Sequence, residues 1–427
     1  MDLALFVVFL LRSSADYVFD ALRIEVGGLN LTAGAFLNVG LLALASLMLL
    51  SRKRPPSLVA VWLPFLGIAA GSILWAPEKG EGLRALLVLS TYFAVFAIPF
   101  MVNKHTHGKG TLLKALIYSS IAPSIFGFLE FFFFPDASGR IKSLFLHPNV
   151  FAFYLTFVSG IIFFLLESST VSFRPAVRKF MYLHLGVLGA LLVLTQTRAA
   201  WVGLFIVFGV HAVFVNRRYL LILLVAPLLL FVPAVSDRLT DLEQGTEYRG
   251  GFKSQSDSIN SFAWRKVMWE SALDDLSGSF VLGKGLASFG TNSLTFFPIV
   301  DPTHRYGSKG VGAHNVYIQI LYETGVVGLI CYLAIFAKLL SLALEYRRYD
   351  RRGAVTIASV ILGYMVESFS DNMFEYGSVN LYFWGGVGVI FSYWARQRSN
   401  ASIEGGSART MQAKISGSSQ ILGGSPA

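Results

Sequence analysis

The sequence predicts an all-α membrane protein with about twelve transmembrane helices and one long extracytoplasmic loop that contains short helices. Of the 427 residues, 54% are hydrophobic and only 14% are charged, and the chain holds 37 Phe. A soluble globular protein carries roughly 25% charged residues. Apolar runs long enough to cross a bilayer recur along the chain. These observations place the chain among the polytopic membrane proteins.

Eleven apolar runs define the expected spans. They lie at about 35–50, 58–75, 85–102, 112–134, 144–166, 180–197, 199–216, 219–235, 315–344, 354–370 and 380–395. The amino-terminal run from Leu3 to Leu11 is too short to span alone. It makes a twelfth span only if its helix continues through Arg12, Asp16 and Asp20. No basic region or small-residue cleavage site marks that run as a signal peptide.

Lysine and arginine in the short loops predict how the spans are oriented. The loops on one side carry 14 of these residues and the opposite loops carry 7, so the positive-inside rule makes the first side cytoplasmic. Both termini are then cytoplasmic, and the long loop 236–312 is extracytoplasmic. We expect one membrane domain over 1–395 and a disordered, Gly- and Ser-rich cytoplasmic tail over 396–427. The net charge of +10 therefore reflects topology, and no soluble basic patch predicts nucleic-acid binding.

The long loop contains one expected helix and one glycine-rich stretch. The segment 261–276 predicts an amphipathic helix, and its paired tryptophans favour a position at the membrane interface. Its apolar positions are Trp264, Met268, Trp269, Ala272 and Leu273. "GKGLASFG" (283–290) resembles a dinucleotide-binding turn, but no strand precedes it. We therefore interpret 283–290 as a flexible turn.

The segment "GAHNVYIQILYETGVVGL" (312–329) begins as a polar loop and continues as an apolar helix. Asn315, Gln319 and Glu323 fall at i, i+4 and i+8, so a helix places them on one face. Such a stripe is costly in hydrocarbon unless it faces the bundle interior or a wet cavity. We interpret Gly325 and Gly328 as sites of close helix packing.

Other unusual polar residues gather at the outer ends of the predicted spans. They are Arg84, His147, Asn149, Arg198, Arg265, His314, Glu367 and Asp371. Simpler interpretations exist for two of them, because Arg84 could extend to lipid head groups and His147 could cap a helix. Arg198 is harder to explain by structure alone, since it lies in a short hairpin between two apolar spans.

Four segments in order resemble the O-antigen ligase and O-antigen polymerase superfamily of bacterial inner-membrane glycan transferases. They are "LFLHPNVFAFYLTF" (144–157), "LTQTRAAWVGLF" (194–205), "WRKVMWESALDD…LGKGLASFG" (264–290) and "AHNVYIQILYETGVVGL" (313–329). Together they cover about 140–340, with the long outer loop where the family has it. The hairpin departs from many relatives, which have Ser-Arg where this chain has Gln-Thr-Arg.

The resemblance implies transfer of a glycan from undecaprenyl diphosphate to a sugar hydroxyl, without metal or cofactor. Arginine forks suit the diphosphate because they bind phosphate oxygens bidentately, and a histidine suits the proton transfer. The resemblance therefore assigns His314 as the catalytic base. The expected diphosphate-binding residues are Arg198, Arg265 and Arg84, and the expected supporting polar wall consists of Asn315, Gln319, Glu323, His147 and Asn149.

Two activities stay open within this superfamily, together with one outside it. A polymerase joins lipid-linked repeats of an exopolysaccharide or O-antigen, and a ligase moves the polymer onto lipid A-core. The loop 236–312 carries 8 Lys and Arg against 9 Asp and Glu, so it has no dense basic patch for a phosphorylated acceptor, which favours a polymerase. A transporter would place its ionisable groups near mid-bilayer instead. Expected partners are the lipid-linked glycan, the acceptor glycan, membrane lipid and a chain-length regulator, with the site facing the periplasm.

Overall fold

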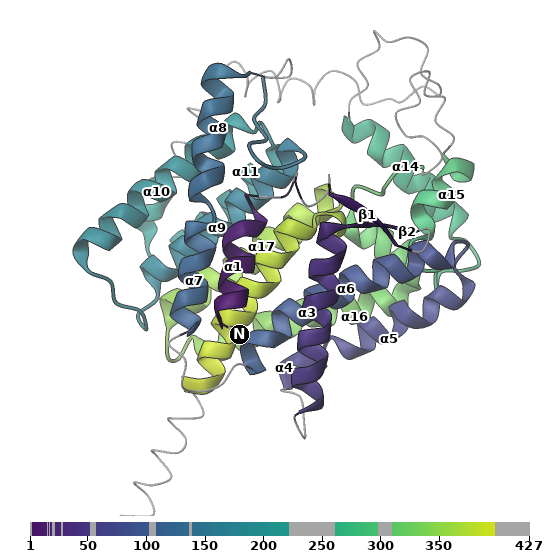
Figure 1. Cartoon of the computed structure of the whole chain (residues 1–427), viewed down its shortest axis with the longest axis horizontal. Helices are drawn as coiled ribbons and strands as arrows, with labels where there is room; N and C mark the ends of the chain where they lie inside the picture. The colour runs from purple at the N-terminus through teal and green to yellow at the C-terminus, as the bar shows by residue number, and fades with distance from the viewer. Residues whose placement is uncertain are drawn as a thin grey trace, which may run out of the picture.

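Figure 1 shows a computed structural model of the chain, a bundle of helices. The structure describes residues 2–14, 16, 18, 22–26, 29–51, 57–101, 108–135, 139–221, 261–297 and 310–397. The predicted span at 219–235 and the predicted tail lie almost entirely outside these residues. Of the loop 236–312, the structure describes 261–297 and 310–312.

The elements follow one another as helices with a single short hairpin near the amino terminus. The first are α1 (Asp2–Arg12), β1 (Arg23–Val26), β2 (Leu29–Thr32), α3 (Ala33–Leu50), α4 (Ser57–Ala60), α5 (Leu63–Ser72), η1 (Ile73–Trp75) and α6 (Lys79–Met101). The middle of the chain forms α7 (Gly108–Tyr118), α8 (Ile121–Phe133), α9 (Pro148–Glu167), α10 (Pro175–Leu194), α11 (Arg198–Phe214) and η2 (Arg217–Tyr219). The last elements are α14 (Ser261–Asp275), α15 (Ser288–Phe296), α16 (Val316–Tyr346), α17 (Arg351–Ser370), η5 (Met373–Glu375) and the helical residues 377–397. The strands β1 and β2 pair antiparallel.

Eight helical stretches in the described part of the chain are long and apolar enough to cross a membrane. Each coincides with a predicted span, and α11 is a shorter apolar helix. The helical membrane fold is therefore confirmed, while the count of twelve stays a prediction. The amino-terminal helix α1 ends at Arg12, so it is not one of the eight.

The centre of the bundle is formed by α9 and α17. Almost all of α9 is buried, and Gly160 lets it approach α17 so closely that a Cβ there would overlap Val360. Aromatic rings tie α17 to the last helix, because Tyr364 stacks on Phe383 with 3.7 Å between ring centroids. The close packing of these two helices fixes the positions of the residues at their outer ends.

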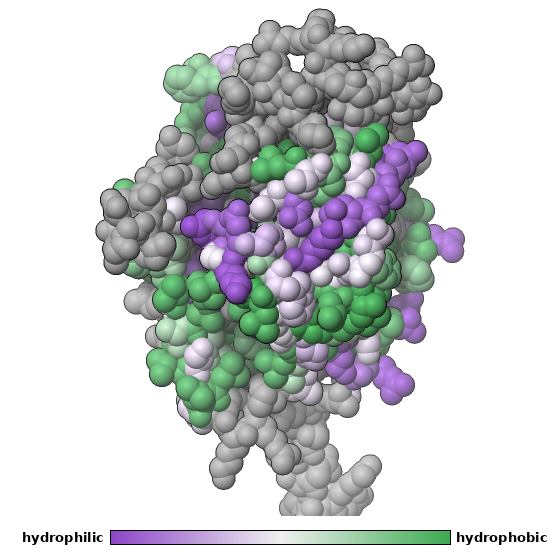
Figure 2. Space-filling view, turned by 90° about the vertical axis from the view of Figure 1, so that its right-hand side faces the viewer, coloured by the Kyte–Doolittle hydropathy of each residue, from purple (hydrophilic) through white to green (hydrophobic). Residues whose placement is uncertain are grey.

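The surface of the protein also has separate polar and apolar regions. Figure 2 shows the face that carries α15, with hydrophilic residues across its middle and hydrophobic residues over its lower part. In Figure 1, α14 and α15 lie to one side of the bundle, close to the upper end of α17. The candidate site lies at that end.

Candidate active site

The helix α14 packs against the protein with the face predicted for the membrane interface. Its Met268 and Ala272, together with Leu276 directly after the helix, are buried against α15, the start of α16 and the segment 310–315. Of the apolar positions that the sequence indicated, Leu273 is exposed. This face therefore packs against protein, and the position of the helix at the membrane interface stays a prediction.

Three side chains of α14 reach the site. The indole Nε1 of Trp269 donates a hydrogen bond to the carbonyl oxygen of Ala313 at 2.7 Å. The ring of Trp264 lies edge-on to the ring of His314, with 5.8 Å between centroids. Arg265 Nη1 donates to the carbonyl oxygen of Ser370 at 2.8 Å. Thus α14 fixes the residue before the histidine, the histidine ring and the end of α17.

The predicted polar stripe on α16 is shorter than expected, because Asn315 lies outside the helix and caps it. The Asn315 Oδ1 accepts hydrogen bonds from the backbone N–H of Tyr317 at 2.9 Å and of Ile318 at 3.1 Å. A cap of this kind satisfies two of the free N–H groups at a helix start. Gln319 and Glu323 do share a face, and the Gln319 amide donates to the Glu323 carboxyl at 3.1 Å.

The glycine-rich turn is packed against a break in α16, which corrects its interpretation as a flexible turn. The helix is interrupted at Gly325, where φ is +71°, and a Cβ there would overlap the carbonyl of Val281. The backbone N–H of Gly285 donates to the carbonyl oxygen of Glu323 at 2.9 Å. The Glu323 carboxyl also faces the backbone N–H groups at the start of α15. Glu323 therefore anchors the outer loop, and its place in the polar wall around His314 stays a prediction.

The centre of the site is a pair formed by His314 and Asp371. His314 Nδ1 lies 3.3 Å from Asp371 Oδ1. The histidine has a backbone φ of +48°, a region that costs non-glycine residues roughly 1–3 kcal/mol and that is common at functional sites. Its side chain is 36% exposed, whereas that of Asp371 is 3% exposed. The pair therefore presents an accessible imidazole on a buried carboxylate.

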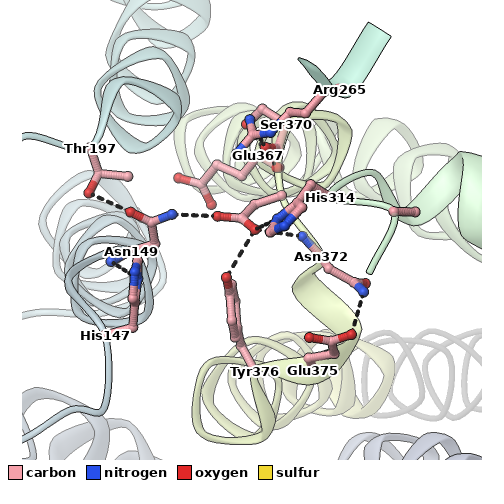
Figure 3. Close-up of polar contacts among 12 residues, drawn as sticks. His147, Asn149, Thr197, Arg265, His314, Glu367, Ser370, Asn372, Glu375 and Tyr376 are labelled. Atoms are coloured by element: carbon pink, nitrogen blue, oxygen red, sulfur yellow. Dashed lines mark hydrogen bonds and ion pairs between the residues drawn. The ribbon is translucent and has the colours of Figure 1, made fainter. Parts of the chain in front are cut away.

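Asp371 is held by three further donors, as Figure 3 shows for the surrounding residues. Its Oδ2 accepts from Asn149 Nδ2 at 2.6 Å. Its Oδ1 accepts from the hydroxyl of Tyr376 at 2.9 Å and from the backbone N–H of Asn372 at 2.8 Å. Four donors on one carboxylate favour its charged form.

The charge on Asp371 follows from a balance of opposing effects. Burial alone raises the pKa of Asp371. The hydrogen bond from His314, the charge of that imidazole and the nearby guanidinium of Arg265 outweigh burial and bring the pKa to about 2. Asp371 is thus an ionised acceptor at neutral pH.

Asn149 connects the pair to the hairpin between α10 and α11. Its Oδ1 accepts from Arg140 Nη2 at 2.7 Å and from the hydroxyl of Thr197 at 3.3 Å. Arg140 also donates to the carbonyl oxygen of Thr195 at 2.9 Å. His147 caps α9, because its Nδ1 accepts from the Asn149 N–H at 3.1 Å, which agrees with the simpler interpretation of that residue. Burial and the charge of Arg140 lower the pKa of His147.

Arg198 begins α11, directly after Thr197. Further along α11, Gly203 lies so close to Glu367 of α17 that a Cβ would overlap the carboxyl group. The outer ends of α11 and α17 are therefore adjacent, and Arg198 is near the end of the bundle that carries Asp371. Arg265 and Arg198 thus come from separate segments to the same end of the molecule.

Arg84 is positioned differently from the other two predicted arginines. It lies within α6, which begins at Lys79, several residues before the predicted span. Its Nη1 donates to both carboxyl oxygens of Glu81 at 3.1 and 3.2 Å, and its side chain is 62% exposed. Within the described residues Arg84 forms this surface ion pair and no hydrogen bond to the residues around His314.

Three residues of the site were not selected from the sequence. The sequence indicates Asp371 only as one of the polar residues at the outer ends, and it does not indicate Arg140 or Tyr376. Asp371 follows a span in "ESFSDNMF", so its position after a buried Glu was the available signal. Arg140 and Tyr376 lie in short loops, where the sequence alone does not indicate which way a side chain points.

A comparison with known protein families covers the middle of the chain. Residues 183–333 match the family model described as O-antigen ligase. This segment is similar to the O-antigen ligase family, and the match supports the O-antigen ligase superfamily. The predicted resemblance is confirmed, and the family implies a glycosyl-transferring enzyme. A search of the curated proteins found no match.

The residues that match the family model contain part of the site. Arg198, Arg265 and His314 lie within the matched residues, whereas Asn149 and Asp371 lie outside them. The family and the apolar helices fit a protein of the bacterial inner membrane. No cluster of three His, Cys, Asp or Glu side chains that could hold a metal occurs among the described residues. The metal-free mechanism stays a prediction.

Proposed function

We propose that this O-antigen ligase-type protein transfers a glycan from undecaprenyl diphosphate to a sugar hydroxyl, with His314 as the general base. The observation that carries the proposal is the accessible imidazole of His314 beside the buried carboxylate of Asp371. An exposed imidazole that is oriented by a carboxylate has the geometry of a general base. The reaction class comes from the family, whose members transfer glycosyl groups.

The partner of His314 determines which ring nitrogen can act as the base. An ionised carboxylate only accepts hydrogen bonds, so a neutral His314 must direct Nδ1–H toward Asp371. The lone pair is then on Nε2. Asp371 in turn is oriented by Asn149 and Tyr376, so the imidazole is held in one tautomer and one direction.

The proposed step is a single displacement. The oxygen of the acceptor hydroxyl forms a bond to the anomeric carbon of the donor sugar, and the bond from that carbon to the diphosphate oxygen breaks. The hydroxyl proton moves to Nε2 of His314. The electron pair of the broken bond leaves with undecaprenyl diphosphate.

The departing diphosphate requires positive charge, and Arg198 and Arg265 are our candidates for binding it. Both lie in the outer part of the bundle near Asp371. A guanidinium binds two phosphate oxygens in parallel and keeps its charge at all physiological pH values. Such groups act mainly by stabilising charge that develops as the bond breaks. Arg84 is a weaker candidate. Its side chain pairs with Glu81 at the surface and, within the described residues, makes no hydrogen bond to the residues around His314.

We favour a polymerase over a ligase because the outer loop 236–312 carries almost no net charge. The loop is nearly neutral, whereas an acceptor such as lipid A-core carries phosphate groups that a basic surface would attract. The description of the matched family supports the ligase instead. The two activities use the same arginines and the same base, and they differ in the acceptor.

Deletion of the gene distinguishes these activities. A polymerase mutant should leave single repeats and no long chains. A ligase mutant should accumulate long chains that are still bound to undecaprenyl diphosphate, and that result would contradict the polymerase. Complementation with wild-type protein should restore the product, and complementation with His314→Ala at equal abundance should not. Normal product from the His314→Ala strain would contradict the catalytic assignment.

A further inference from the structure

A cavity of about 830 Å³ lies at the end of the bundle opposite to His314. It is partly open and is lined by α7, the last turn of α9, residues 170–174, the start of α10 and the helical residues 377–397. The helix α9 runs from Asn149 in the site to Phe164 and Leu165 in the cavity wall. Fifteen residues of helix rise about 22 Å, so the cavity is a separate feature at the other membrane surface.

Most of the wall is apolar, and its charged members are all basic. The apolar part includes Phe164, Leu165 and Phe180, and the two charged residues are Lys114 and Arg174. No acidic side chain lines the cavity, and within the described residues no carboxylate pairs with either cation. The wall thus combines a surface for hydrocarbon with uncompensated positive charge.

The start of α10 adds a second feature that favours an anion. Arg174 occupies the N-cap position of α10, and its side chain makes no capping hydrogen bond. The first N–H groups of a helix lack intrahelical partners and carry partial positive charge. Ala176 and Val177 of this first turn line the same cavity. A phosphate near Arg174 would meet both the guanidinium and these N–H groups.

We propose that this cavity binds an anionic phospholipid of the cytoplasmic leaflet. Lys114, Arg174 and the start of α10 hold the phosphate, and an acyl chain occupies the apolar part. The leaflet follows from the predicted orientation, in which the loop between α9 and α10 is cytoplasmic. Basic pockets between transmembrane helices on the cytoplasmic side bind anionic head groups, and the cavity has the size of a ligand site.

Native mass spectrometry of the full-length protein, released from a mild detergent, tests the proposal. Phosphatidylglycerol and phosphatidylethanolamine with identical acyl chains are titrated separately, so that only the head group differs. We expect wild-type protein to bind phosphatidylglycerol at least about tenfold more tightly, given the contribution of each nearby cation. The double variant Lys114→Ala/Arg174→Ala should lose most of this preference and still bind phosphatidylethanolamine as before.

A matched control uses two arginines at the same end of the bundle that do not line the cavity. Arg347 and Arg348 are exposed after α16, and Arg347→Ala/Arg348→Ala should retain the wild-type preference. A further variant, Ala176→Trp, should weaken binding of both lipids because the indole fills the cavity. Equal affinity of wild-type protein for the two lipids would overturn the proposal, as would an unchanged preference in the Lys114→Ala/Arg174→Ala variant.

Discussion

Two histidine–carboxylate pairs lie at opposite ends of the bundle, and their surroundings differ. His211 is fully buried, with Nε2 at 3.1 Å from Glu167 and Nδ1 at 2.9 Å from the hydroxyl of Thr356. His314 is 36% exposed, and within the described residues only its Nδ1 forms a hydrogen bond. Both ring nitrogens are therefore engaged in the first pair, and one is available in the second.

The difference indicates which pair can perform chemistry. A buried pair with every polar atom satisfied stabilises the packing of the helices that contribute to it. Here it links α9, α11 and α17, and Tyr219 completes it by donating to Glu167 at 2.5 Å. A general base must reach its substrate and must have a free lone pair. Only the outer pair meets both conditions.

The arginines should give the largest loss of activity among the residues around the outer pair. Arg265→Ala and Arg198→Ala should each lower the transfer rate by about 10²–10³, the typical cost of removing one group that stabilises developing charge. Lysine should restore little, because it lacks the planar fork. Rates are measured with purified protein and a lipid-linked glycan. Full activity of both lysine variants would mean that these residues only contact lipid head groups.

Asp371→Asn should have a smaller effect, because the imidazole remains but loses its orientation and its ionised partner. We expect a loss of about 10–100-fold, by analogy with carboxylates that orient a metal-bound histidine through its other ring nitrogen. The pH profile provides the specific readout, since a purely structural role would lower activity equally at every pH. We expect the pH dependence of the rate to shift as well. An unchanged rate and an unchanged profile would remove Asp371 from the mechanism.

The inner pair should affect stability and leave the rate per folded molecule unchanged. His211→Ala leaves a cavity and removes a partner of the buried Glu167 and Thr356. Such losses cost roughly 2–4 kcal/mol, and thermal unfolding in detergent should show a lower midpoint. A strong loss of transfer rate at normal stability would contradict the division between the two pairs.

Acid should weaken the outer pair by a modest amount. The pKa of Asp371 is about 2 in the folded protein, below its ordinary value of 3.8, so the unfolded chain takes up the proton first as the pH falls. The stabilisation is therefore complete above about pH 4 and is lost toward pH 2, by about 2 kcal/mol. Thermal unfolding at pH 6, 4 and 3 measures it. Asp371→Asn should lose less stability over that interval, and an equal loss would argue against the depressed pKa.

The sequence predicted the spans and the end of the bundle that carries the site, because hydropathy and loop charge act over whole segments. It also pointed to His314 and Asn149, which the structure connects through Asp371 and whose roles stay predictions. It could not assign Asn315 as a cap or Glu323 as the anchor of the glycine-rich turn, because the helix begins after Asn315 and breaks at Gly325. Contacts between distant segments, such as that of Asn149 with Asp371, depend on the folded arrangement.

The division between the two pairs can be measured in a single assay. Wild-type protein, His314→Ala and His211→Gln are purified, and the initial rate of transfer from an undecaprenyl-diphosphate-linked glycan is normalised to folded protein. We expect His314→Ala to lower the rate by about 10²–10⁴-fold with unchanged membrane insertion. We expect His211→Gln to keep the wild-type rate. Wild-type activity in folded His314→Ala would contradict its role as the base.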